Sequence, residues 1–134
     1  MPMTLLLVDD EPSFSQVLKE VVLRGGKFKV VGRAEDGVAA LKLVEKLRPE
    51  AVLMDVEMPV LDGFRTARSI RSRFPSTRVV LTSFRQGREM QQLAVWAGAL
   101  TFMSKLELSE DRLWEMFQGD MLEEEFRSLA QEQG

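Results

Sequence analysis

Five short apolar runs recur along the chain, and stretches with helical spacing separate them. The runs are Thr4–Val8, Phe28–Gly32, Ala51–Met54, Arg78–Leu81 and Leu100–Met103. β-Branched residues and leucine dominate the runs, and a length of about five residues is typical of buried strands. Each run therefore predicts a β-strand.

The stretches between the runs place apolar residues three and four positions apart, as on one face of a helix. Two such series are Phe14, Val17, Leu18, Val21 and Val22, followed by Val38, Leu41, Val44 and Leu47. Turn and capping residues mark the boundaries, at Pro12, Gly25-Gly26, Pro49, Asp62-Gly63 and Gly98. The pattern predicts a strand followed by a helix, five times over.

Strands that are apolar throughout and that alternate with helices favour a parallel sheet covered on both faces, with right-handed crossovers. This pattern does not give the order of the strands. The last helix is expected to begin near Ser109, whose hydroxyl can cap it. Glu110 and Asp111 suit the positive end of the helix dipole there.

We expect residues 1–118 to form one domain, because a chain of 134 residues falls in the range of an ordinary domain. Residues 119–134 are acidic and are interpreted as a C-terminal tail or as an extension of the last helix. Apolar residues at near-helical spacing favour packing of this segment, namely Met121, Leu122, Phe126 and Leu129.

Composition and charge exclude several classes of function. The apolar runs are too short to span a bilayer, and the start of the chain does not resemble a secretory signal, so we expect a cytoplasmic protein. A net charge of −3 and scattered arginines argue against direct binding of nucleic acid.

The absence of cysteine and histidine excludes thiolate and imidazole metal sites, and histidine-dependent triads. Carboxylates, hydroxyls and lysine remain, and these suit hard cations and phosphate.

Polar side chains follow four of the five predicted strands. Asp9 and Asp10 follow the first strand, Asp55 the third, Thr82 the fourth and Lys105 the fifth. Ligands bind at the carboxyl edge of parallel α/β sheets, so we expect these side chains to meet there. Three clustered carboxylates repel one another unless a cation offsets their charge, and Mg²⁺ fits such oxygen ligands.

This set of groups is suited to phosphoryl transfer. A carboxylate can attack phosphorus while a metal ion and Lys105 neutralise charge on the phosphoryl oxygens, and Thr82 can donate a hydrogen bond. The product would be an aspartyl phosphate. Taken alone, Asp9-Asp10 could instead cap a helix near Pro12, and Asp55 could be a turn residue.

Four segments, in this order, resemble the receiver domain of bacterial two-component response regulators, over about residues 3 to 118. They are Leu6–Pro12, Val52–Pro59 with Asp62-Gly63, Val80–Ser83, and Gly98-Ala99 through Lys105. The resemblance implies a flavodoxin-like (βα)5 three-layer sandwich with a five-stranded parallel sheet in the order 2-1-3-4-5. In that order the strands that carry the acidic residues are neighbours.

The resemblance also implies roles for individual residues. Asp55 would be the phosphorylated residue, Asp10 a direct magnesium ligand and Asp9 a ligand acting through water, with the Glu57 backbone carbonyl as a further ligand. Thr82 would move toward the phosphoryl group. Phe102 would be the switch aromatic, although it lacks the hydroxyl of the tyrosine often found at that position.

The implied function is a two-component phosphorelay switch. A sensor histidine kinase or a phosphotransfer protein would donate the phosphoryl group, and the change in surface would alter binding of an output protein or domain. A homodimer that forms on phosphorylation is a further hypothesis. We expect a phospho-acceptor with slow self-dephosphorylation rather than an enzyme, without membrane attachment.

Two other functions compete with this one. A haloacid-dehalogenase-like phosphatase also uses an aspartate nucleophile, magnesium, a hydroxyl and a lysine, but it places its nucleophile after the first strand in an Asp-x-Asp element. Here the acidic pair comes first, and Asp55 is followed by Val56-Glu57. An unphosphorylated adaptor that kept the fold is the binding-module alternative, and failure to bind magnesium would favour it.

Overall fold

The computed structural model describes residues 2–12, 16, 18–20, 24–58, 62–85 and 87–118. Within them, five strands form one sheet in the order β2-β1-β3-β4-β5. The strands are β1 (Met3–Val8), β2 (Phe28–Ala34), β3 (Ala51–Asp55), β4 (Arg78–Ser83) and β5 (Thr101–Ser104). All neighbouring pairs are parallel, so the predicted fold and strand order are confirmed.

Four strands end beyond the apolar runs that predicted them. β2 continues to Ala34, β3 to Asp55, β4 to Ser83 and β5 to Ser104. Asp55 pairs with Thr82 in the sheet register, and Thr82 pairs with Met103. The backbone ladder therefore continues past the last apolar side chains and carries polar residues to the edge of the sheet.

Helices follow β2, β3, β4 and β5, as the pattern predicted. They are α2 (Gly37–Leu47), α3 (Gly63–Arg73), α4 (Arg88–Ala97) and α5 (Glu110–Gln118), with a short 3₁₀ helix, η1 (Lys105–Glu107). Side chains of Asp36, Asp62 and Ser109 accept hydrogen bonds from first-turn backbone N–H groups. Most of the helical series from Phe14 to Val22 lies outside the described residues. None of the described helices is both long and apolar enough to cross a membrane.

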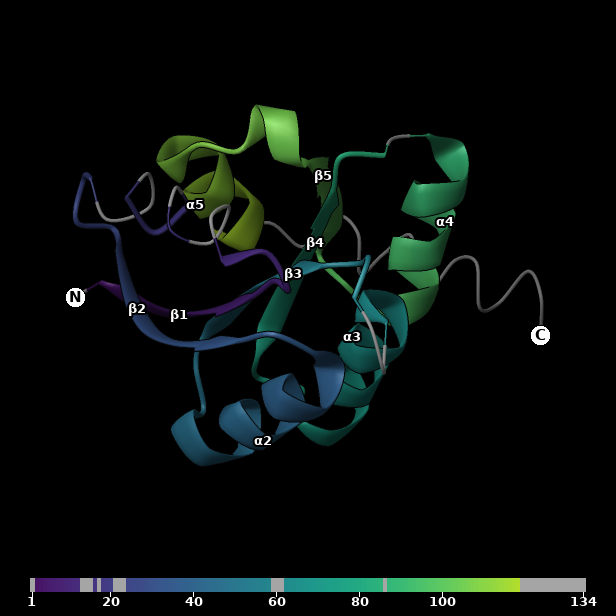
Figure 1. Ribbon diagram of the computed structural model, residues 1–134, viewed down its shortest axis with the longest axis horizontal. Helices are drawn as coiled ribbons and strands as arrows, with labels where there is room; N and C mark the ends of the chain where they lie inside the picture. Colours follow the sequence, from purple (N-terminus) through teal and green to yellow (C-terminus); the bar gives the residue numbers. More distant parts are fainter. Residues whose placement is uncertain are drawn as a thin grey trace.

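The sheet separates two hydrophobic cores. Figure 1 shows α2, α3 and α4 on one side of the sheet and α5 on the other. Leu6 and Val8 of β1 face the core beneath the three helices, whereas Leu5 and Leu7 face the core beneath α5. Because successive side chains of a strand point to opposite faces, a strand buried on both faces reads as one continuous apolar run.

Helix α5 holds the edge strand β2 in place. The Phe28 ring packs edge-to-face against Trp114 and Phe117, with ring centroids 5.8 and 6.0 Å away. Glu110 Oε2 accepts hydrogen bonds from the backbone N–H groups of Gly25 (2.9 Å) and Lys27 (3.3 Å). Contacts between segments far apart in the sequence thus fix the start of β2 at the amino edge of the sheet, opposite the edge that carries Asp9 and Asp55.

Candidate functional site

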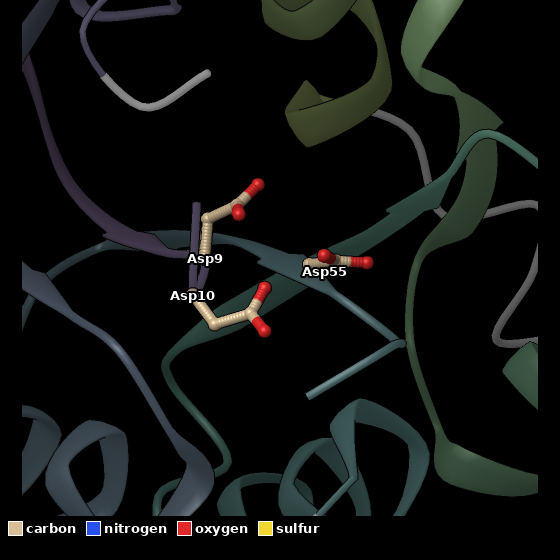
Figure 2. Close-up of side chains that lie close together, drawn as sticks. All are labelled: Asp9, Asp10 and Asp55. Atoms are coloured by element: carbon tan, nitrogen blue, oxygen red, sulfur yellow. The ribbon is translucent and has the colours of Figure 1, made fainter. Parts of the chain in front are cut away.

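The carboxyl edge of the sheet brings together the polar residues that the sequence indicated. Asp9 and Asp10 extend from the end of β1 and Asp55 from the end of β3, and Figure 2 shows their three side chains gathered at this edge. Thr82 lies on β4 beside Asp55, and Lys105 follows β5. Asp9, Asp55, Thr82 and Lys105 are each less than one-tenth exposed.

Lys105 joins the two buried carboxylates. Its Nζ lies 3.0 Å from Asp9 Oδ2 and 3.2 Å from Asp55 Oδ2. One ammonium between two carboxylates leaves one negative charge buried, and the exposed Asp10 adds another at the rim. A buried excess charge is unfavourable unless a further group compensates it. The site therefore favours a cation.

The carboxylate oxygens are placed to hold such a cation. One oxygen from each of Asp9, Asp10 and Asp55 lies within 4.8 Å of the others. Asp9 Oδ1 accepts a hydrogen bond from the Glu11 backbone N–H at 2.7 Å. Asp9 Oδ2 is buried and shares the Lys105 ammonium with Asp55. A buried carboxylate in a cluster with excess negative charge fits a hard metal ion.

Burial and charge shift the pKa values of this cluster. Burial raises the pKa of Asp55, and the neighbouring Asp9 charge adds to the effect. The Glu57 backbone N–H, 3.0 Å from Asp55 Oδ1, and the Lys105 ammonium oppose the rise. Burial on its own would lower the pKa of Lys105, but the Asp9 and Asp55 carboxylates outweigh it and raise that pKa. Lys105 therefore stays protonated, while ionised Asp55 gains from added positive charge.

Gly63 fixes the backbone on which Asp55 sits. A Cβ atom at this position would lie 2.4 Å from the Asp55 carbonyl oxygen and 2.7 Å from the Val56 Cα. The Gly63 N–H donates to the Val56 carbonyl, and the Val56 N–H donates to the Thr82 carbonyl. The sequence marked Asp62-Gly63 as a helix boundary. The close approach to Asp55, which only glycine allows, was missed because no local pattern reveals it.

The predicted switch residues lie beside this cluster. Thr82 Oγ1 donates a hydrogen bond to the Met103 carbonyl at 2.7 Å, so its hydroxyl links β4 to β5. Phe102 is buried in the core that contains Met90 of α4. The Phe102 carbonyl accepts a hydrogen bond from Gln91 Nε2 of α4 at 3.1 Å. A chain of contacts therefore runs from the site to α4.

Two residues at the rim, Phe84 and Arg85, had no site role in the sequence interpretation. Phe84 is 55% exposed, and its ring centroid lies 5.0 Å from Lys105 Nζ. Arg85 Nε lies 2.5 Å from Glu57 Oε1, so an exposed ion pair joins the loops after β4 and β3. The only available signal was that Phe84-Arg85 directly follows Thr82-Ser83 in the sequence.

The fold and the site together define an α/β domain whose carboxyl edge holds an acidic, lysine-bridged cluster at the switch point of the strand order. The family model described as "Response regulator receiver domain" matches residues 5–118. The chain belongs to this family, as the motif order predicted.

Solved structures of the family have the same fold. The signal receiver domain of the response regulator NarL from Mycobacterium tuberculosis is 30% identical, and the match covers 88% of this chain and 98% of that one with a TM-score of 0.82. The response regulator domain of Thermotoga maritima CheB is also 30% identical, with 88% and 95% coverage and a TM-score of 0.78.

Curated relatives include proteins named protein-glutamate methylesterase/protein-glutamine glutaminase. One from Hahella chejuensis is 38% identical over 105 residues, which is 77% of this chain and 30% of that protein. One from Pyrococcus abyssi is 34% identical over 111 residues, with 78% and 30% coverage. The chain thus spans about 30% of the length of these relatives.

One prediction is wrong. We expected a phospho-acceptor switch with slow self-dephosphorylation rather than an enzyme, but these relatives are named as enzymes, and the response regulator domain of CheB is among the similar structures. The motifs that led to this expectation all lie in the shared receiver portion. They carry no information about the rest of a relative's chain, so they could not exclude enzymes as a class.

Proposed function

We propose that Asp55 accepts a phosphoryl group from a phosphohistidine on a sensor histidine kinase or phosphotransfer protein, in a reaction that requires Mg²⁺. The observation that carries the proposal is the Lys105 ammonium, held 3.0 Å from Asp9 and 3.2 Å from Asp55 in a cluster that keeps one excess negative charge. The chain has no histidine. The donor group must therefore come from outside these 134 residues.

In the proposed reaction a carboxylate oxygen of Asp55 attacks phosphorus in line with the leaving imidazole nitrogen. The new O–P bond forms as the N–P bond breaks, and the electron pair of that bond returns to the imidazole. The Glu57 N–H fixes the carboxylate orientation through Asp55 Oδ1. Lys105 is already charged and lies next to the attacking group, so it can pair with a phosphoryl oxygen without reorganising.

Mg²⁺, when bound, would neutralise charge on the carboxylates and on the phosphoryl oxygens. We propose Asp10 and Asp55 as direct ligands, Asp9 as a ligand through water, and the Glu57 carbonyl as a further ligand. Two observations support a cation between the three carboxylates. Their oxygens lie within 4.8 Å of one another, and the buried Asp9 and Asp55 share a single ammonium, that of Lys105.

Phosphorylation would then be transmitted through Thr82 and Phe102. To reach a phosphoryl oxygen, the Thr82 hydroxyl must release the Met103 carbonyl, which it now holds at 2.7 Å. That release frees the β5 backbone next to Phe102, whose own carbonyl is held by Gln91 of α4. The proposed result is a changed surface around α4, which alters binding of an output partner or of a second copy.

The effector itself is a separate part of the proposal. We propose residues 1–118 as the receiver, and the names of the curated relatives make a protein-glutamate methylesterase/glutaminase region the first output to test. The measurement is binding of such a region to this chain with and without phosphorylation. Equal binding in both states would count against this effector while leaving the acceptor chemistry intact.

The direct test is intact-mass spectrometry after incubation with Mg²⁺ and either acetyl phosphate or phosphoramidate, whose P–N bond mimics that of phosphohistidine. The wild type should gain one phosphoryl group. Asp55→Ala should gain none, and Asp111→Ala, which alters an exposed carboxylate on α5, should behave as wild type. Folded wild-type protein that gains no phosphoryl group from either donor would contradict the proposal and favour an unphosphorylated adaptor.

A further inference from the structure

Helix α3 presents an unusually one-sided charge. It contains four arginines and no acidic residue, namely Arg65, Arg68, Arg71 and Arg73. Residues 119–134 have the opposite character, with five carboxylates (Asp120, Glu123, Glu124, Glu125 and Glu132) and one basic residue, Arg127, a net charge of −4. The two segments are complementary in charge.

An open groove of about 430 Å³ lies along the exposed side of α3, next to α4. We call it the arginine groove, and its lining is Arg65, Arg68, Ser69, Ser72, Arg73 and Trp96. No carboxylate belongs to this lining, and among the described residues the one carboxylate paired with it is that of Asp62, whose Oδ2 lies 3.7 Å from Arg65 Nε. Trp96 is 44% exposed, and the Arg68 guanidinium lies 4.5 Å from the centre of its ring. The groove therefore offers positive charge and one exposed aromatic face to an acidic, partly apolar segment.

Two surface pockets that share Ser76 and Arg78 lead from the end of α5 to Arg71 of α3. Gln118, the last residue of α5, lines a surface pocket together with Ser76 and Arg78. Ser76 and Arg78 also line the adjoining pocket, which adds Arg71. Arg71 is followed in the chain by Ser72 and Arg73 of the arginine groove. Apart from Glu50 in the first pocket, the charged residues along this path are arginines.

We infer that residues 119–134 dock in the arginine groove of their own chain. The Glu123–Glu125 run would pair with the α3 guanidinium groups, and Phe126 or Leu129 would cover Trp96. Sixteen residues reach up to about 50 Å when extended. This length is several times the radius of gyration of about 13 Å expected for a domain of this size. Covalent attachment gives the segment a local concentration in the millimolar range, which favours it over a separate acidic partner.

The inferred contact would be weak and sensitive to salt. An exposed ion pair contributes only about 0.2–1 kcal/mol, so several must act together, and salt screens them. Docking would cover Trp96 on α4, the helix through which the proposed switch acts. The segment would therefore compete with any partner that binds this part of α4. The inference does not depend on phosphorylation of Asp55.

The test uses the full chain and the natural absence of cysteine. A nitroxide on Ser128→Cys is the single label, and the two tryptophan indole N–H signals of Trp96 and Trp114 are the readout in NMR spectra. At low salt we expect the Trp96 signal to be lost through paramagnetic broadening and the Trp114 signal to remain. Half-molar salt should restore the Trp96 signal.

Charge-reversed variants make the test specific. Arg68→Glu with Arg73→Glu should restore the Trp96 signal, and adding Glu124→Arg and Glu125→Arg to that variant should remove it again. Lys42→Glu with Lys46→Glu, which reverses two exposed lysines on α2, should leave the broadening unchanged. A Trp96 signal that persists at low salt in the labelled wild type would overturn the inference. So would broadening that passes from a labelled chain to a separate isotope-labelled chain, because that result would identify a second copy as the occupant.

Discussion

The amino and carboxyl edges of the sheet differ in how fully their polar groups are paired. At the amino edge, the buried Thr77 Oγ1 donates to the Pro49 carbonyl at 3.0 Å, and the exposed Arg78 side chain donates to the Phe117 carbonyl. At the carboxyl edge, the buried Asp9 and Asp55 share one lysine, which leaves one buried negative charge uncompensated. Satisfied groups stabilise a fold, whereas unsatisfied charge in the same sheet marks a place for a ligand.

This contrast predicts that substitutions near the amino edge mainly lower the free energy of unfolding, whereas substitutions at the carboxyl edge mainly slow phosphoryl incorporation. The largest effect on stability should come from Phe117→Ala, close to the amino edge. Phe117 is fully buried against Phe28, so the cavity should lower the free energy of unfolding by about 3–5 kcal/mol. Urea denaturation measures this change. Phosphoryl incorporation at a temperature where the variant is folded should remain, and its loss would show that the two edges are coupled.

Lys105→Ala tests the carboxyl edge, where the expected effect is on the rate of phosphoryl incorporation. Removing the ammonium that lies beside Asp55 should slow phosphoryl incorporation by about 10²–10³-fold, since a preorganised charge next to the reacting group is lost. The rate of mass gain with phosphoramidate measures it. Lys46→Ala on α2 is the matched control. A rate within about twofold of wild type for both variants would remove Lys105 from the proposed chemistry.

Asp55→Asn should stabilise the protein, in contrast to an ordinary substitution of a buried residue. The folded-state pKa of Asp55 is raised, mainly by burial. The favourable contribution of this group is therefore fully present only below the ordinary carboxyl pKa, near pH 4, and is lost as the pH rises through the raised pKa. At pH 7 the buried charge destabilises the fold, and neutral asparagine relieves it.

We expect Asp55→Asn to raise the free energy of unfolding at pH 7, without divalent cations, because the excess buried negative charge is removed. The gain should shrink as the pH falls toward about 4. Denaturation curves across this range provide the measurement. Glu45→Gln, which neutralises an exposed carboxylate on α2, should show no comparable gain. A constant gain at every pH would contradict the electrostatic explanation.

Mg²⁺ should produce the smallest of these effects, and only at the carboxyl edge. At a concentration of ten times its dissociation constant, the ion should raise the free energy of unfolding of the wild type by about 1.4 kcal/mol. Asp10→Asn should lose most of this increase, whereas Thr77→Val at the amino edge should keep it despite its lower baseline stability. An equal increase in all three proteins would indicate that the ion acts elsewhere.

Much of the fold could be predicted because the sequence signals are local and repeated. Apolar runs predicted all five strands, and Asp62, Ser109 and Gly98 marked helix ends where the structure has them. The strand ends were placed too early at Asp55 and Ser83. Backbone pairing with a neighbouring strand sets these ends, and side-chain polarity does not report that pairing.

The candidate site was predictable only in its composition. The side chains at the carboxyl edge followed from the parallel order of the strands, and Asp9, Asp55 and Lys105 do meet there. The bond from Thr82 to the Met103 carbonyl and the approach of Gly63 to Asp55 depend on distances between distant segments. No spacing in the sequence encodes those distances.

The parallel arrangement also determines when the site can form during folding. No two neighbouring strands of the described sheet are joined by a hairpin, and the pair Lys105–Asp55 closes a separation of 50 residues. Such non-local pairings form late, because chain entropy opposes them until most of the sheet is in place. A partly folded molecule would present Asp55 without its lysine. The site could therefore accept a phosphoryl group only in molecules whose sheet has paired from β1 through to β5. Phosphorylation would distinguish these molecules from partly folded ones.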